Sequence, residues 1–298
     1  MKCIKRISLF LLILASCASL SAISMVYNFR IAQITKQPIK LEQGQRNHVV
    51  VALLFDQFRK KYSGATQNYT GGLSSYIYDF GSYYFRTDGA FAHVKEKRSD
   101  GVHFSGTNTD DILFTFGRNF ILDERKVITF SSLLGVPTHR SNRLKHPDFG
   151  YGQVGLAFQI DGSYELNAIS TLLYGARYIY FVPRRAYDLL DNRYKFTLGN
   201  IGDLLLAYKN NWQRQHGIEF GTTLRSRFGA HVRPDFDDIV KRSNYLRSNF
   251  YGVYKYKFTL GATANRILLY SGYGFDHKPK KFGQKYIVTL WTSWSVGF

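Results

Sequence analysis

The strongest constraint on the fold is a two-residue alternation that runs through residues 285–298. Even positions form an apolar face that is rich in aromatic rings: Tyr286, Val288, Leu290, Thr292, Trp294, Val296 and Phe298. Odd positions form a mixed, more polar face: Lys285, Ile287, Thr289, Trp291, Ser293, Ser295 and Gly297. Successive side chains of a β-strand point to opposite faces, so this period predicts a strand with one apolar face. An exposed soluble edge of this kind would aggregate, which favours a face in contact with lipid.

The same alternation recurs along the body of the chain. It is clearest in 152–165, 215–228 and 248–260, where apolar residues such as Phe158 alternate with polar ones such as Gln159. Similar segments are 74–85, 110–120, 126–136, 168–181, 202–212 and 266–275. Strands with one apolar and one polar face are typical of transmembrane β-barrels, whose closure pairs every backbone group within the lipid. A repeat of roughly 22 residues per strand and connection gives about twelve strands, in a range of about ten to fourteen.

The composition agrees with this all-β fold, an antiparallel transmembrane β-barrel. Phe and Tyr contribute 24 and 22 of the 298 residues and hydrophobic residues 45%, which excludes a disordered chain. The longest apolar run after the N-terminal segment is 49–55, far shorter than the roughly 20 residues that a membrane-spanning helix needs. None of the six prolines falls inside a predicted strand, where it would remove a hydrogen bond of the sheet.

The first 22 residues have the pattern of a secretory signal peptide. A basic start at 2–6 precedes the apolar stretch 7–15, and small residues follow it. We favour ordinary cleavage after a small residue, which would lower the formal net charge from +19 to +16. The alternative is lipidation at Cys17, because Leu-Ala-Ser-Cys at 14–17 resembles a lipobox. Both cysteines lie in this segment, so the exported chain is expected to contain no disulfide.

The rest of the chain divides less sharply. We expect the barrel to occupy 73–298, after an N-terminal lead over 23–72 that holds the first strands or a plug. Within this lead, 27–35 and 48–58 are candidate strands. Four charged stretches are predicted to be loops between strands: 139–149, 184–193, 231–244 and 276–281.

The last strand resembles the C-terminal strand of bacterial outer-membrane β-barrels, which ends in Phe after apolar residues at alternate positions. The residues that carry this resemblance, a membrane-insertion signature, are Tyr286, Val288, Leu290, Trp294, Val296 and Phe298. The resemblance implies a location in the cell outer membrane, in a Gram-negative-type envelope. It also implies three partners: the barrel-assembly machinery, outer-membrane lipids and lipopolysaccharide.

A weaker resemblance is to the outer-membrane transporters linked to the meta-pathway of phenol degradation. It rests on the order of an Asp-rich strand start at 109–117, a Gly-Val-Pro-Thr-His turn at 135–139 and a Gly-rich strand start at 149–156. A Gly-Asp pair at 202–203 resembles the strand start again. Asp110 and His139 stand where the family has glycine. The resemblance implies a barrel that passes or binds small molecules, including apolar ones.

The excess of basic residues is the sequence feature that says most about function. The alternation places eleven charged residues on the inner face, among them Asp111 and Asp203. The other nine are candidate lumen-lining residues: Lys209, Arg225, Arg227, Lys255, Lys257, Lys285, Asp161, Glu165 and Glu219. A lumen lined with Lys and Arg attracts anions, and basic loops can bind the phosphates of lipopolysaccharide. The alternative is a solvated, mixed-charge lumen without selectivity.

The sequence points to no catalytic residue, metal site or cofactor. The histidines lack metal-ligand spacing, and no nucleophile motif is present. The acidic pairs at 110–111 and 237–238 leave a hydrolase at the barrel rim as a minor alternative, although paired Asp residues are more often solvated turn residues. Nucleic-acid binding is not expected, because no recognition motif accompanies the basic charge.

The sequence therefore predicts a passive, porin-like outer-membrane channel or transporter for small solutes, with a positively biased lumen and no enzymatic activity. The main alternative is a structural or adhesive barrel whose lumen is filled by side chains and the N-terminal segment.

Overall fold

A computed structural model of the chain describes residues 47–60, 66–97, 101, 103–109, 111–138, 153–187, 193–196, 199–213, 215–228, 245–277 and 284–298. The predicted signal peptide with Cys17, the candidate strand 27–35 and the predicted loops 139–149 and 231–244 lie outside these residues. Within the described part, no helix is long and apolar enough to cross a membrane.

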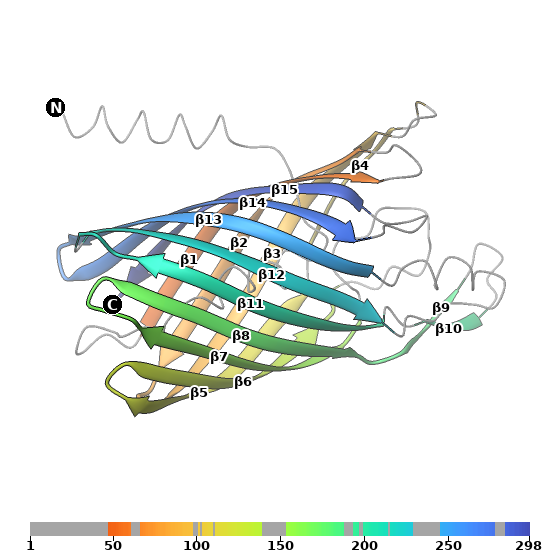
Figure 1. Cartoon of the computed structure of the whole chain (residues 1–298). Helices are drawn as coiled ribbons and strands as arrows, with labels where there is room; N and C mark the ends of the chain where they lie inside the picture. The colour runs from red at the N-terminus through yellow and green to blue at the C-terminus, as the bar shows by residue number, and fades with distance from the viewer. Residues whose placement is uncertain are drawn as a thin grey trace.

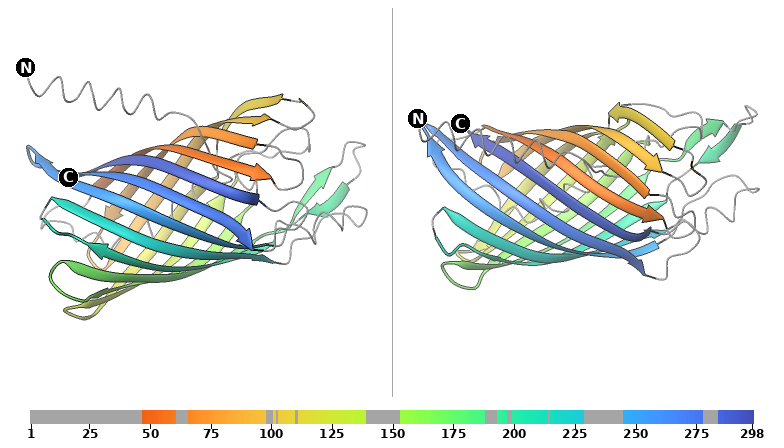
Figure 2. Two further views of the ribbon diagram at one scale, coloured as in Figure 1. Left: turned by 45° about the horizontal axis from the view of Figure 1, so that its top comes forward. Right: turned by 90° about the horizontal axis from the view of Figure 1, so that it is seen from above.

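Twelve strands form a closed antiparallel barrel, as Figures 1 and 2 show. They are β1 (Asn47–Lys60), β2 (Thr66–Asp79), β3 (Tyr83–Lys97), β5 (Ile112–Asp123), β6 (Lys126–Val136), β7 (Gly155–Glu165), β8 (Ser170–Phe181), β11 (Asn200–Asn210), β12 (His216–Phe228), β13 (Tyr245–Leu260), β14 (Thr263–His277) and β15 (Gln284–Gly297). Neighbours in this order pair with each other, and the pairing of β1 with β15 closes the ring. The predicted fold class and strand number are confirmed.

A thirteenth strand, β4 (His103–Thr109), continues the line of β5. The long strand β3 pairs with β5 over its first part and with β4 over its last part. Between the pairs Asp88–Leu113 and Phe91–Thr109, two residues of β3 oppose three residues of the other strand, which is the geometry of a β-bulge. The fully buried Asp111 lies at this bulge.

The connections distinguish the two ends of the barrel. At one end, called here the short-turn end, the strands are joined by brief turns such as 124–125 and 261–262. The first and last described residues meet there, because the amides of Asn47 and Phe298 each donate to the other's carbonyl at 3.1 and 3.0 Å. At the opposite end, longer stretches of sequence separate consecutive strands, such as the residues between Val136 and Gly155 and those between Phe228 and Tyr245. In outer-membrane barrels the short turns face the periplasm.

Apolar side chains cover the outer face of the barrel and alternate with an inner face of mixed character. On β7, Phe158 is 67% exposed whereas its neighbour Gln159 is 7% exposed. On β15, Trp294 is 51% exposed and Trp291, three residues earlier, is 6% exposed. An apolar surface that surrounds the whole barrel requires an apolar environment, which suits the acyl chains of a bilayer.

The N-terminal boundary of the barrel differs from the expected one. The barrel begins at Asn47 rather than at residue 73, because β1 and the first half of β2 fall in the expected lead. The inner face of β1 is itself apolar, with Val50, Ala52 and Leu54 buried, while Val51 and Leu53 are exposed on the outer face. Because both faces of β1 are apolar, its sequence shows no two-residue alternation of apolar and polar residues. The sequence therefore indicated only a candidate strand at this position.

Three further expectations are corrected. The predicted strand 74–85 is two strands, since a turn at 80–82 separates β2 from β3. In this turn Gly81 has a positive φ of 94°, and its amide donates to the carboxylate of Asp79 at 2.8 Å. The predicted loop 276–281 begins too early, because Asp276 is buried in β14. The predicted loop 184–193 contains a short strand, β9 (Arg184–Tyr187), which pairs with β10 (Arg193–Phe196).

Candidate functional site

The inner wall of the barrel holds most of the predicted lumen-lining residues. Lys209, Arg225 and Glu219 are buried on the inner face. Arg227, Lys255, Asp161 and Glu165 are partly buried, and Lys257 is exposed towards the short-turn end. The side chain of Lys285 lies outside the described part of the structure. The charged residues fall into separate groups on this wall.

The first group is an arginine–aspartate belt on the inner faces of β8, β11, β12, β13 and β14. It consists of Arg177, Asp203, Arg225, Arg247 and Asp276, all buried. Arg177 donates to Asp203 Oδ2 through Nε at 3.0 Å and Nη2 at 2.8 Å, and Arg225 donates through Nε to Asp203 Oδ1 at 2.7 Å. Arg247 donates to both oxygens of Asp276, at 2.6 and 3.3 Å.

The strand register explains why the belt forms. Asp203 on β11 lies directly opposite Arg177 on β8 and, on its other side, opposite Arg225 on β12. Arg247 on β13 likewise lies between Arg225 on β12 and Asp276 on β14 and is directly opposite each of them. Directly opposite side chains of an antiparallel pair interact, and oppositely charged ones attract. Because the groups are buried, each carboxylate offsets the large cost of desolvating its guanidinium partners.

A smaller ion-pair group lies on the inner faces of β2 and β3. Arg86 donates to Asp88 Oδ1 through Nε at 2.7 Å, and its Nη2 atom lies 3.0 Å from the hydroxyl of Ser75. That hydroxyl also donates to Asp88. All three side chains are buried, so the inner wall at β2 and β3 also contains an ionic group whose charges are paired with each other.

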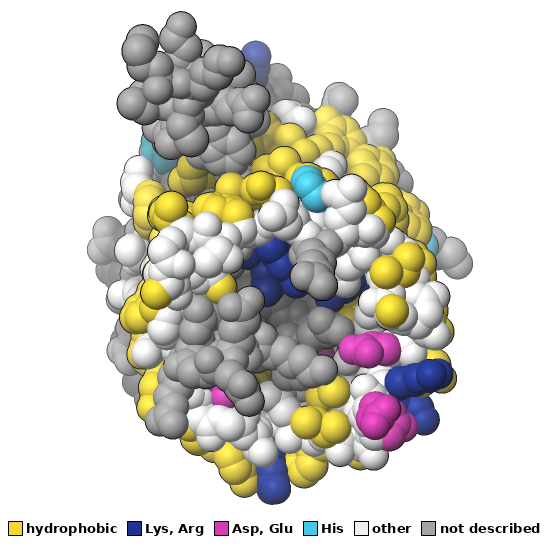
Figure 3. Space-filling model, turned by 90° about the vertical axis from the view of Figure 1, so that its left-hand side faces the viewer, with side chains coloured by type: hydrophobic (Ala, Val, Ile, Leu, Met, Phe, Trp, Pro, Cys, Tyr) yellow, Lys and Arg dark blue, Asp and Glu magenta, His cyan; other side chains and the backbone are white. Residues whose placement is uncertain are grey.

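The third group is called the mouth cluster here and contains Lys209, Glu219, Lys255, Lys257 and Arg266. It lies on β11, β12, β13 and β14 near the short-turn end. Lys255 Nζ donates to Glu219 Oε2 at 2.5 Å, and Lys209 lies directly opposite Glu219 in the register. Lys257 lies directly opposite Arg266. Figure 3 looks onto this end and shows Lys and Arg side chains inside the central hollow.

An aromatic ladder crosses the same wall on β13, β14 and β15. The rings of Tyr251 and Tyr270 stack with centroids 5.4 Å apart, and those of Tyr270 and Trp291 stack at 4.9 Å. Tyr251 Oη donates to Glu219 Oε1 at 3.2 Å, which joins the ladder to the mouth cluster. Gly221 makes room for the first ring, because a Cβ there would lie 2.5 Å from Tyr251 Cζ.

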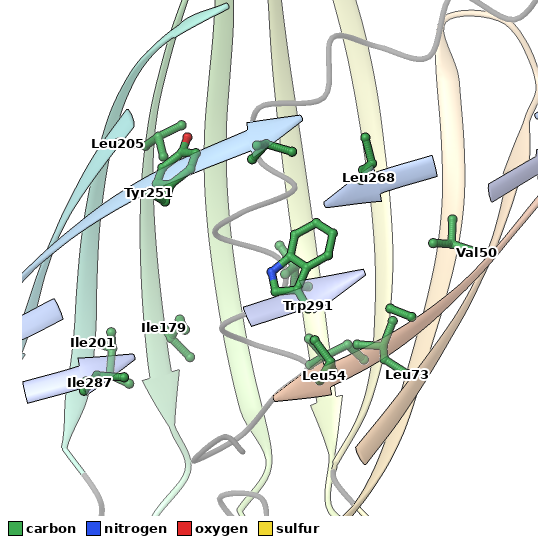
Figure 4. Packing of buried hydrophobic residues seen from close by; sticks show 14 of the residues in the cluster. Val50, Leu54, Leu73, Ile179, Ile201, Leu205, Tyr251, Leu268, Ile287 and Trp291 are labelled. Carbon is green, nitrogen blue, oxygen red and sulfur yellow. The ribbon is translucent and has the colours of Figure 1, made fainter. Parts of the chain in front are cut away.

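Apolar side chains line much of the remaining inner wall. Leu205, Leu268 and Ile287 are buried with Tyr251 and Trp291, as Figure 4 shows. Residues of the same cluster reach β1 and β2 through Leu54 and Leu73. The inner wall of the barrel therefore combines apolar side chains with ionic groups.

Several residues of this wall were not among the predicted site residues. The omitted residues are Arg177, Asp203, Arg247, Asp276, Arg266, Tyr251, Tyr270 and Trp291. Alternation alone places all but Arg247 and Asp276 on the inner face of a predicted strand, so the signal was present for Arg177 and Asp203. Arg247 and Asp276 lie just outside the predicted strands. The sequence does not show which inner residues lie opposite one another, because that depends on the register between strands.

The weaker motif resemblance maps onto the wall as well. Gly202 and Asp203, the second Gly-Asp pair, lie in β11, and Asp203 is the centre of the belt. Asp111 is buried beside the β-bulge, whereas Asp110 lies outside the described residues, as do 237–238. In the described part of the chain no group of three or more His, Cys, Asp or Glu side chains could hold a metal ion.

The closed barrel, its apolar outer face and its charged inner wall define the class: the chain has the fold of the outer-membrane β-barrel proteins. No protein-family model and no curated protein sequence matches the chain. The resemblance to the transporters of phenol degradation therefore stays a prediction.

Solved structures of outer-membrane barrels are similar to the chain. The COG4313 outer membrane channel from Pseudomonas putida F1 aligns with a TM-score of 0.71 and 12% identity, over 88% of this chain and 100% of that one. The beta domain of the Bordetella autotransporter Brka aligns with a TM-score of 0.53 and 11% identity, over 85% and 100%. The translocator domain of the autotransporter NalP from Neisseria meningitidis gives 0.51 and 9%, over 91% and 94%. At identities this low, the structural alignments show a shared fold and nothing further.

Proposed function

We propose that the chain is a passive outer-membrane channel for small solutes whose lumen is biased towards positive charge. The observation that carries the proposal is the excess of basic side chains on the inner faces of β11–β14, in the belt and the mouth cluster. A basic wall attracts anions, and a low-dielectric surrounding strengthens this attraction. The similarity to the channel from Pseudomonas putida F1 supports the choice of a channel at the level of the fold.

The charges are distributed unevenly around the lumen. On β11–β14 the described inner cations are Lys209, Arg225, Arg227, Arg247, Lys255, Lys257 and Arg266, beside Asp203, Glu219 and Asp276. On β3–β7, across the barrel, the acidic residues Asp88, Asp111, Asp161 and Glu165 accompany Arg86. Anions are therefore expected to pass along the β11–β14 side.

Conductance of the purified protein in planar bilayers tests the proposal. We expect discrete current steps, and a reversal potential in a KCl gradient whose sign shows preferred passage of chloride. A matched bilayer without protein is the control. No current in the bilayer, together with no uptake of small solutes into liposomes, would rule out the channel.

A filled structural barrel is the second candidate function. The observation in its favour is the depth of burial of many inner side chains, among them Phe181, Ile179 and Ile201, which are fully buried. Such a barrel would insert into bilayers and bind lipids without conducting. The conductance measurement therefore separates the two candidates.

The proposed location is the cell outer membrane after export, with the short-turn end towards the periplasm. Outer-membrane lipids and lipopolysaccharide would contact the apolar outer face and the connections at the opposite end, and the barrel-assembly machinery would insert the chain. Protease accessibility in whole and permeabilised cells tests this orientation, since the turn at 261–262 would be cleaved only after permeabilisation.

A further inference from the structure

The mouth cluster places like charges against one another. Lys257 and Arg266 lie directly opposite on β13 and β14, a register that destabilises a sheet when both residues carry the same charge. Lys209 lies within electrostatic range of Lys255, Lys257 and Arg266. Four cations therefore converge on one part of the inner wall, close to the short-turn end.

The carboxylate of the cluster is already engaged. Glu219 is fully buried, and its Oε2 accepts from Lys255 while its Oε1 accepts from Tyr251. Both oxygens thus have a donor on the β13 side. Among the described residues, no other carboxylate belongs to the cluster, so its formal charge is positive.

Arg266 provides a second and independent observation. Its Nε atom is buried and has no hydrogen-bond partner in the described part of the chain. Buried guanidinium donors are normally satisfied, and an unsatisfied one is costly. In the belt, by contrast, the Nε atoms of Arg177, Arg225 and Arg247 all donate to a carboxylate.

We propose that the mouth cluster is a binding site for a small anion with a carboxylate or phosphate group. The anion would accept a hydrogen bond from Arg266 Nε and pair with Lys257, while Lys209 and Lys255 add to the local positive potential. A planar guanidinium suits both groups, because it can donate two parallel hydrogen bonds to their oxygens. The site rests on the proposed channel function and assigns it a binding step at the short-turn end.

Calorimetric titration of the full-length barrel in detergent tests the site, with acetate and inorganic phosphate as separate probes. We expect one saturable anion site in the wild type, and affinity roughly tenfold or more lower in Arg266→Gln, since a hydrogen bond to a charged group is lost. Stronger binding of acetate would assign a carboxylate ligand, and stronger binding of phosphate a phosphorylated one.

Arg118→Gln is the matched control, because it removes the same charge from an exposed residue whose guanidinium stacks over Tyr83 and Phe120. It is expected to bind both probes as the wild type does. If Arg266→Gln fails to fold, the exposed Lys257→Gln takes its place, with circular dichroism and heat-modifiable gel mobility as folding checks.

The outcomes separate the site from the channel. A wild type that conducts but binds neither probe would overturn the anion site and leave the channel standing. Saturable binding without conductance would support the site and overturn the channel. Equal affinities of the wild type and folded Arg266→Gln or Lys257→Gln would also overturn the site.

Discussion

The arginine–aspartate belt and the mouth cluster are made of similar residues and differ in how their charges are matched. In the belt, Asp203 and Asp276 accept hydrogen bonds from three arginines, and all five side chains are buried. In the mouth cluster, Glu219 is the described carboxylate beside four cations. The Nε atoms of the three belt arginines thus all donate to a carboxylate, while the Nε atom of Arg266 in the cluster has no hydrogen-bond partner among the described residues.

Basic residues on the inner wall of the barrel are therefore not equally available for binding a ligand. Burial makes ion pairing obligatory, because an unpaired buried charge is strongly destabilising. The belt arginines are therefore expected to contribute mainly to the stability of the barrel. In the proposed function, the cations of the mouth cluster are the ones that interact with solutes. Substitutions in the two groups should separate stability from function.

The largest effect is expected for Asp203→Ala in the belt. The substitution leaves Arg177 and Arg225 buried without their shared carboxylate, and breaking a buried pair in this way costs about 3–5 kcal/mol. Urea unfolding of the barrel refolded in lipid measures the loss. Asp123→Asn, at an exposed turn, is the control and should change stability little. A loss as small as the control's would mean that the belt is not structural.

The second-largest effect is expected for a charge on the outer face, and it tests whether the belt and the mouth cluster lie inside the barrel. Phe158→Arg puts a charge on the outer face of β7 and is expected to cost about 2–4 kcal/mol at the bilayer midplane. Phe158→Leu, which keeps the face apolar, should fold into lipid vesicles nearly as well as the wild type. Equal folding yields of the two variants would show that the assigned faces are reversed.

A moderate effect is expected at the aromatic ladder, which links the cluster to the wall. In Gly221→Ala the new methyl group would lie 2.5 Å from Tyr251 Cζ and 2.7 Å from Ala207 Cβ, so the Tyr251 ring must move away from residue 221. Overpacking of this kind costs about 1–3 kcal/mol.

Gly252→Ala is the matched control for the ladder, because its methyl group would lie 3.4 Å from the nearest atoms, in the Phe220 ring. The melting temperature in detergent, followed by circular dichroism, compares the two variants. A destabilised Gly252→Ala with an unaffected Gly221→Ala would contradict the packing of Tyr251 against Gly221.

The sequence predicted the strands wherever their two faces differ in polarity. β6 agrees with its predicted range residue for residue, and β7 and β12 differ from theirs by a few residues at most. β1 could not be placed with equal certainty because its inner face is apolar, so that Val50, Ala52 and Leu54 continue the outer apolar run. A period-two signal exists only when one face meets lipid and the other meets polar groups.

The candidate site was predictable in part for a related reason. Alternation places Lys209, Arg225 and Glu219 on the inner face without any knowledge of their neighbours. Predicting the belt also requires the register between strands, because the role of Asp203 depends on its pairing with Arg177 and Arg225 on the two adjacent strands. Register depends on the lengths of the connections and on packing, which the pattern within one strand does not encode.

The smallest effect on stability, and the most direct test of the comparison, is expected for Lys257→Gln in the mouth cluster. Lys257 is exposed and lies opposite a like charge, so its neutralisation should change the free energy of unfolding by no more than about 0.5 kcal/mol. The same change should lower the preference for anions, measured from the reversal potential in a KCl gradient, roughly a few-fold.

Lys97→Gln removes an equal charge from an exposed position at the far end of β3 and should leave the reversal potential unchanged. The effect of Lys257→Gln should also shrink as salt is raised from about 0.1 M to 1 M, because the screening length falls from about 10 Å to 3 Å. If instead Lys257→Gln destabilised the barrel as much as Asp203→Ala does, the cluster would be a structural group like the belt, and the distinction between the two regions would fail.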